Sequence, residues 1–162
     1  MKSTVCLGVV IAMSAAIGTS HAADQVSIIG SYQLVKRVLP GGATLTPPVV
    51  VGFQTYTASY RNFSVHWTDP GGHDVSLSLI SRYELTPERY CEHPIYWMQN
   101  NLAVPGVRYT WPKQKEECSA VKVEGDRITF AINGEPVVAT FDPTSFVAKA
   151  EGLFTDYWQR VK

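Results

Sequence analysis

Residues 61–85, RNFSVHWTDPGGHDVSLSLISRYEL, decide the fold of this chain. Apolar and polar side chains alternate on both sides of the DPGG segment at 69–72, which is the periodicity of a strand with one buried face. A proline followed by two glycines is typical of a turn. The stretch therefore predicts an antiparallel hairpin. Its apolar face is expected to carry Phe63, Val65, Trp67, Val75, Leu77 and Leu79.

The same pattern of alternating runs and turns continues to the end of the chain. EGD at 124–126, Asn133-Gly134 and DPTS at 142–145 separate further runs, and Asn-Gly is a strong hairpin signal. From residue 29 onward we expect nine or ten antiparallel strands, the last over 154–161, with a long loop over 103–118 and no helix. Closing such a meander removes its edges. The prediction is an all-β, up-and-down antiparallel β-barrel, with a sandwich as the alternative.

The first residues have the features of a secretory signal peptide. Lys2 is followed by the apolar run VCLGVVIAMSAAIG at 5–18, and SHA at 20–22 provides small residues for cleavage. We expect a signal peptide over 1–22, cleavage after Ala22, a single barrel domain over 23–162, and a periplasmic or secreted product. The apolar run is too short to span a bilayer, which needs about 20 residues, so no membrane span is expected.

The charge balance argues against a nucleic-acid partner. The chain has 14 Lys and Arg residues and 14 Asp and Glu residues. Losing the signal peptide removes only Lys2 from this count, which leaves a mature chain that is close to neutral and slightly acidic. Nucleic-acid binding requires a basic surface, and no basic cluster stands out. The sequence leaves the oligomeric state open.

Two cysteines remain in the predicted mature chain, Cys91 and Cys118. An even number of cysteines in an oxidising compartment favours a disulfide. We therefore expect Cys91 to pair with Cys118, with two buried free thiols as the alternative.

Three stretches resemble the bacterial lipocalin-like domain family. Gly30-Ser31-Tyr32 followed by QLVKRV is similar to the start of that family's first barrel strand. The stretch VVGFQTYTASYRNFSVHW at 50–67 is similar to the family's second and third strands. Trp158-Gln159-Arg160 is similar to its chain end. The resemblance implies a calycin-type barrel that binds small molecules, and it does not imply any particular reaction. It also implies that Arg160 packs on the Tyr32 ring at the closed end, as a cation–π pair.

The chain has 18 aromatic residues, many at alternating positions. In a small barrel such side chains fill the interior or line a ligand cavity. We expect a cavity for a small, largely apolar molecule, and residues 90–101 as its rim. The predicted ligand-binding residues are Phe63, Val65, Trp67, Leu77, Leu79, Tyr83, Tyr96 and Trp97. A filled barrel that binds a protein through its outer surface is one alternative.

The second alternative is an enzyme of isomerase or cyclase type. It would combine His66 or His93 with Glu92, Arg82 or Tyr96 inside the barrel, and a β-bulge that exchanged the faces would bring His66 and Arg82 inward. No nucleophile motif supports this reading. His66, His73 and His93 do not have the spacing of a metal motif. We therefore expect no catalytic residues, no metal and no cofactor.

Overall fold

The computed structural model describes residues 27–69, 71–101, 104–110, 117–132 and 136–162. The predicted signal peptide over 1–22 and the predicted Asn133-Gly134 turn lie outside these ranges. Within them the chain forms a sheet of 13 β-strands and no helix. The strands are β1 (Gly30–Val38), β2 (Thr44–Leu45), β3 (Val50–Tyr56), β4 (Tyr60–Thr68), β5 (Asp74–Leu85), β6 (Arg89–Asn101), β7 (Val104–Thr110), β8 (Glu117–Ala120), β9 (Lys122–Glu124), β10 (Arg127–Ile132), β11 (Val137–Phe141), β12 (Ser145–Ala150) and β13 (Phe154–Arg160).

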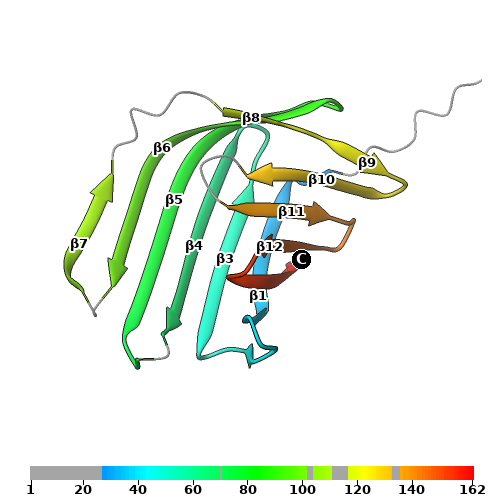
Figure 1. Ribbon diagram of the computed structural model, residues 1–162. Helices are drawn as coiled ribbons and strands as arrows, with labels where there is room; N and C mark the ends of the chain where they lie inside the picture. Colours follow the sequence, from blue (N-terminus) through cyan, green and yellow to red (C-terminus); the bar gives the residue numbers. More distant parts are fainter. Residues whose placement is uncertain (1–26, 70, 102–103, 111–116, 133–135) are drawn as a thin grey trace, which may run out of the picture.

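The strands form an antiparallel up-and-down barrel that is nearly closed, as the sequence predicts. Their order is β7-β6-β5-β4-β3-β1-β13-β12-β11-β10-β9, and β1 pairs with β13, so the first and last long strands are neighbours. The sheet coils strongly: in Figure 1 β4 to β6 run up and down the picture, whereas β10 and β11 run across it. This coiling encloses the space between the two halves of the sheet.

The predicted hairpin at 61–85 is formed by β4 and β5, and its apolar residues face one another. Phe63 lies opposite Leu79, and Trp67 lies opposite Val75. In the turn, the Asp69 N–H donates to the carbonyl of His73 at 2.8 Å, and the Gly72 N–H donates to the carbonyl of Asp69 at 2.9 Å. The final strand, β13, is also confirmed. The long loop expected over 103–118 is wrong in part, because Val104–Thr110 pairs with β6 as β7.

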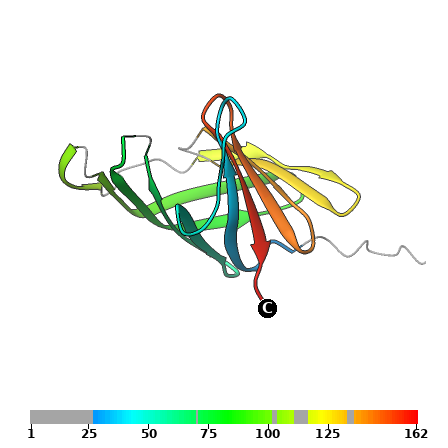
Figure 2. The ribbon, with the colours of Figure 1, turned by 90° about the horizontal axis from the view of Figure 1, so that it is seen from below.

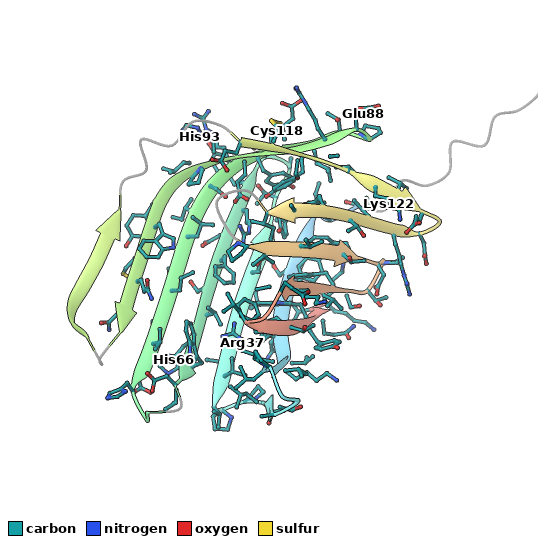
Figure 3. All side chains as sticks on the ribbon, in the orientation of Figure 1. Arg37, His66, Glu88, His93, Cys118 and Lys122 are labelled. Atoms are coloured by element: carbon teal, nitrogen blue, oxygen red, sulfur yellow. A yellow bond between two sulfur atoms is a disulfide. The ribbon has the colours of Figure 1, made fainter. Side chains whose placement is uncertain are left out.

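Strand β8 connects the two ends of the sheet. It pairs with β6, where Cys91 and Cys118 face each other and form the predicted disulfide. On the other side, the Ser119 hydroxyl donates to the carbonyl of Ala131 in β10 at 2.7 Å. The disulfide therefore fastens the strand that bridges the gap between β6 and β10, at the top of the barrel in Figure 3.

Removing this disulfide is expected to lower the stability of the barrel substantially. Cys91 and Cys118 are 27 positions apart, and closing a loop of that length stabilises a protein by about 3 to 4 kcal/mol on the chain-entropy model. The double variant Cys91→Ala and Cys118→Ala should lose most of this amount in guanidinium unfolding at unchanged pH. Equal stability of the variant and the oxidised wild type would show that β8 is held by its other contacts alone.

The end of the barrel at which β1 begins is filled with aromatic side chains. Six rings form a stacked row with centroid separations from 4.2 to 5.8 Å. The row consists of Trp158, Phe146, Phe141, Phe130, Tyr90 and Tyr83, which belong in turn to β13, β12, β11, β10, β6 and β5. It crosses the interior from β10 to β6, so side-chain packing joins the two halves of the sheet at this closed end.

Tyr32 and Arg160 lie at the same closed end, as expected. The Arg160 guanidinium carbon is 5.3 Å from the centre of the Tyr32 ring, and Nη2 donates to the Tyr32 hydroxyl at 2.8 Å. Gly30 precedes them with φ of 153°, a conformation that favours glycine. A Cβ atom there would lie 3.5 Å from the Arg160 side chain. This distance is an ordinary van der Waals contact, so the backbone conformation, and not a lack of space beside Arg160, favours glycine at this position.

Candidate functional site

The other end of the barrel is hollow. A cavity of about 980 Å³ lies between β1, β4, β5 and β6 on one side and β11 and β13 on the other. Its edge is formed by residues from the turns at this end, including Leu39, Asp69, Pro136 and Leu153. Figure 2 looks at the barrel from this hollow end, where the β4–β5 turn lies. We call this end the mouth.

Five of the eight predicted ligand-binding residues line this cavity. They are Phe63, Val65, Trp67, Leu77 and Trp97. Alternation places them on one face because β4, β5 and β6 are in register, with Val65 opposite Leu77 and Val75 opposite Trp67. The Phe63 ring lies 6.0 Å from the Trp158 ring, measured between centroids, so Phe63 forms part of the cavity floor above the packed closed end.

The remaining three predicted residues do not line this cavity in the described part of the chain. Leu79 is buried next to the cavity on the side of the closed end, where it pairs with Phe63 of β4 and Trp97 of β6. Tyr83 belongs to the aromatic row, where burial raises the pKa of its hydroxyl to about 12. Tyr96 lies opposite Ile80, whose side chain is exposed, and so it is on the outer face. Adjacent residues in a strand point to opposite faces, so Tyr96 and Trp97 could not both face inward.

Arg37 is a cavity residue that the sequence pattern does not indicate. Tyr32 and Leu34 of β1 are buried, so uninterrupted alternation would turn Lys36 inward and Arg37 outward. Pairing with β13 shifts between Leu34 and Lys36, and Val35 is the extra residue of a β-bulge. Beyond the bulge Lys36 is exposed and Arg37 is buried, and Arg37 lines the cavity. Figure 3 shows Arg37 in the lower half of the barrel, toward the mouth.

Arg37 forms an ion pair with Asp156, its partner on β13. Nε donates to Oδ1 at 2.7 Å and Nη2 donates to Oδ2 at 2.8 Å, and the two side chains are 7% and 3% exposed. Burial raises the pKa of the Asp156 carboxyl, and the hydrogen bond and charge of Arg37 oppose this rise. A buried pair of this kind gains little or nothing in stability over apolar residues, and its Arg37 member is part of the cavity wall.

A second buried ion pair lies in the closed half, away from the cavity. Arg61 Nη1 donates to Glu92 at 3.0 Å, and both residues are 1% exposed. The hydroxyls of Ser81 and Tyr90 also donate to this carboxylate. Glu92 is thus surrounded by hydrogen-bond donors in the core. The enzyme alternative pairs Glu92 with His66 or His93, but Glu92 points into the core, whereas its neighbour His93 lies on the opposite face of β6 and faces Arg82.

The histidines lie apart from one another and outside the cavity. His66 contacts Ser76 at 3.0 Å on the outer face near the mouth, and His93 lies opposite Arg82 at the other end of β5. Figure 3 shows these two histidines at opposite ends of the barrel. His73 contacts Asp69 in the β4–β5 turn at 3.1 Å. Over the described ranges, no three His, Cys, Asp or Glu side chains gather where they could hold a metal ion.

The fold and the cavity define an antiparallel β-barrel with one end packed and the other end hollow. No family model matches the chain, and the searches of curated proteins and of solved structures also found no match. In the part of the chain that the structure describes, no helix has the length and apolar character needed to cross a membrane.

Proposed function

We propose that this protein binds a small, largely apolar molecule in the cavity at the mouth of its barrel. The cavity itself carries the proposal. Its volume of about 980 Å³ falls within the range of roughly 300 to 1,000 Å³ found for ligand pockets. Most of its lining is apolar, with the rings of Phe63, Trp67 and Trp97 providing flat surface for a ligand.

The disulfide supports export as part of the proposal, because disulfides persist in oxidising compartments such as the periplasm. The signal-peptide pattern over residues 1–22 agrees with this. We also propose kinship with the bacterial lipocalin-like domain family, on the strength of the Gly30-Ser31-Tyr32 step and of Arg160. A hollow barrel in an exported protein suits a carrier that takes up an apolar molecule from water and protects it.

A titration with the neutral fluorescent dye phenylnaphthylamine tests ligand binding. The dye should bind the folded protein with one-to-one stoichiometry and quench its tryptophan fluorescence. Trp67→Ala should weaken dye binding by about tenfold or more, because it removes a large apolar surface from the cavity wall. Binding is measured where circular dichroism shows both proteins to be fully folded.

Tyr96→Ala is the matched control, since it removes an aromatic ring from the outer face of the neighbouring strand. It should leave the dissociation constant of the dye unchanged. Absence of dye binding to folded wild-type protein would contradict the proposal. Equal loss in the two variants would show that the dye occupies some other surface.

A further inference from the structure

The Arg37–Asp156 pair gives the proposed ligand site a chemical preference. The guanidinium lies over two aromatic rings. Its carbon lies 4.3 Å from the centre of the Phe154 ring and 5.0 Å from that of Trp67. Asp156 occupies the edge formed by Nε and Nη2. The third edge, at Nη1, donates no hydrogen bond to any residue that the structure describes.

Nη1 therefore has two N–H groups to offer to a molecule in the cavity. Arg37 is part of the cavity lining, and arginine cannot lose its charge in a protein. The two rings and the bidentate contact with Asp156 fix the guanidinium in place, so little conformational freedom is lost when a ligand accepts from it. Most other side chains around it in the cavity are apolar, and an oxygen atom on the ligand would find its strongest donor here.

The charge of the pair decides what kind of oxygen fits. Arg37 and Asp156 together are neutral, so the cavity offers donors without a net positive charge. A carboxylate that approached Nη1 would also approach the Asp156 carboxylate in a poorly solvated space, where like charges repel strongly. Burial already raises the pKa of Asp156, which means that this part of the cavity disfavours negative charge. An uncharged acceptor incurs no such cost.

We infer that the ligand carries an uncharged hydrogen-bond-accepting oxygen, a carbonyl in the simplest case, which accepts from Nη1 of Arg37 while its apolar part lies against Trp67 and Phe63. This inference rests on the proposed function, because it assigns the head group of a molecule whose binding is itself proposed. It distinguishes the site from one that selects fatty acids or other apolar anions.

Three probes of nearly equal shape test the head group. Benzylacetone carries a ketone, butylbenzene has a methylene in place of that carbonyl, and hydrocinnamate has a carboxylate oxygen in place of the terminal methyl group. Each is used to displace phenylnaphthylamine from the full-length mature protein at neutral pH. The quantity compared is the ratio of the dissociation constants of two probes in each protein variant, because the probes differ in their own solubility.

The double variant Arg37→Met and Asp156→Val removes the pair and keeps the site apolar. It should fold, since replacing a buried ion pair by apolar residues is often neutral or stabilising. Relative to butylbenzene, benzylacetone should lose about tenfold in affinity, the size expected for a hydrogen bond to a charged donor. The control pair Lys122→Met and Glu124→Leu removes an exposed ion pair on β9 and should leave the ratio unchanged. An unchanged ratio in the Arg37 and Asp156 variant would overturn the inference.

Asp156→Asn gives the reciprocal test, because it leaves the Arg37 charge without a counter-ion. In this variant hydrocinnamate should gain about tenfold in affinity relative to benzylacetone. Tighter binding of hydrocinnamate than of benzylacetone by wild-type protein would identify an anion site and overturn the inference. Failure of the dye itself to bind would reject the proposed function, whereas dye binding without head-group preference would reject only the role of Arg37.

Discussion

Tyr32→Ala is expected to lower the free energy of unfolding by about 3 to 5 kcal/mol, the usual cost of truncating a large buried aromatic side chain. Tyr32 has no exposed surface, and its ring contacts Tyr56, Phe141 and Phe146 edge to face. Its hydroxyl donates to the Ile28 carbonyl at 2.9 Å and accepts from Arg160. The variant would leave a hole at the closed end of the barrel.

Urea unfolding of Tyr32→Ala and Tyr32→Phe separates the ring from the hydroxyl. Tyr32→Phe keeps the ring contacts and removes only the two hydrogen bonds, so its loss should be smaller, about 1 to 2 kcal/mol. A loss below about 1 kcal/mol for Tyr32→Ala would mean that the closed end does not depend on this ring.

Arg37→Met is expected to have a comparably large effect, about 3 to 5 kcal/mol of lost stability at neutral pH. The substitution leaves the Asp156 carboxylate buried without its counter-ion, although methionine fills a similar volume. Asp156 has only 2% of its surface exposed, and the methionine side chain would take the place of the guanidinium without donating a hydrogen bond. The charge must then be buried alone or be neutralised by a proton.

This loss should depend on pH in a definite direction. Because burial raises the pKa of Asp156 above 3.8, its reference value, the folded protein holds this proton more tightly than the unfolded chain does. The corresponding stability is present below the unfolded pKa and is lost as the pH rises through the folded pKa. Arg37 lowers the pKa, so its removal raises the pKa further and extends this window upward.

The difference in unfolding free energy between wild type and Arg37→Met should therefore be largest at neutral pH and should shrink as the pH falls toward the unfolded pKa. Urea unfolding at a series of pH values measures this difference. The double variant Arg37→Met and Asp156→Val lacks the titrating carboxyl and should recover most of the lost stability. A single variant as stable as wild type at neutral pH would show that Asp156 is solvated.

The sequence was sufficient for those parts of the fold that follow from strict alternation. In the hairpin of β4 and β5, every second residue is apolar over 63–67 and over 75–79, and the turn contains DPGG, so the hairpin and its inward face were predicted correctly. The disulfide followed from the even number of cysteines. β7 was missed because two prolines and a nearby run of charges obscure its pattern. β2, β8 and β9 are too short to show a pattern at all.

The candidate site was predicted only where no bulge intervenes. Extra residues at Val35 in β1 and Ile95 in β6 shift the pairing with the neighbouring strands. A bulge changes which side chains face inward without changing composition or local hydrophobicity, so one sequence contains no signal for it. Arg37 was therefore overlooked. The alternation of β13 could have shown that Asp156 lies on the same inward face as Trp158. A single carboxylate in the sequence, however, does not indicate that a buried arginine on β1 is its partner.

Because Val35 is an extra residue in the pairing of β1 with β13, the chemistry of the cavity depends on how β1 pairs as well as on its residues. Two basic residues stand side by side, and the bulge determines which of them enters the interior. If β1 paired with β13 without the bulge and kept all of its residues, Lys36 would turn inward and Arg37 outward, and a compact ammonium group would replace a planar fork of donors. Deletion of Val35, in contrast, would remove the bulge and keep Arg37 inward. The donor that the cavity offers can therefore change through the pairing of β1 alone, a difference that comparing residues at aligned positions one by one would overlook.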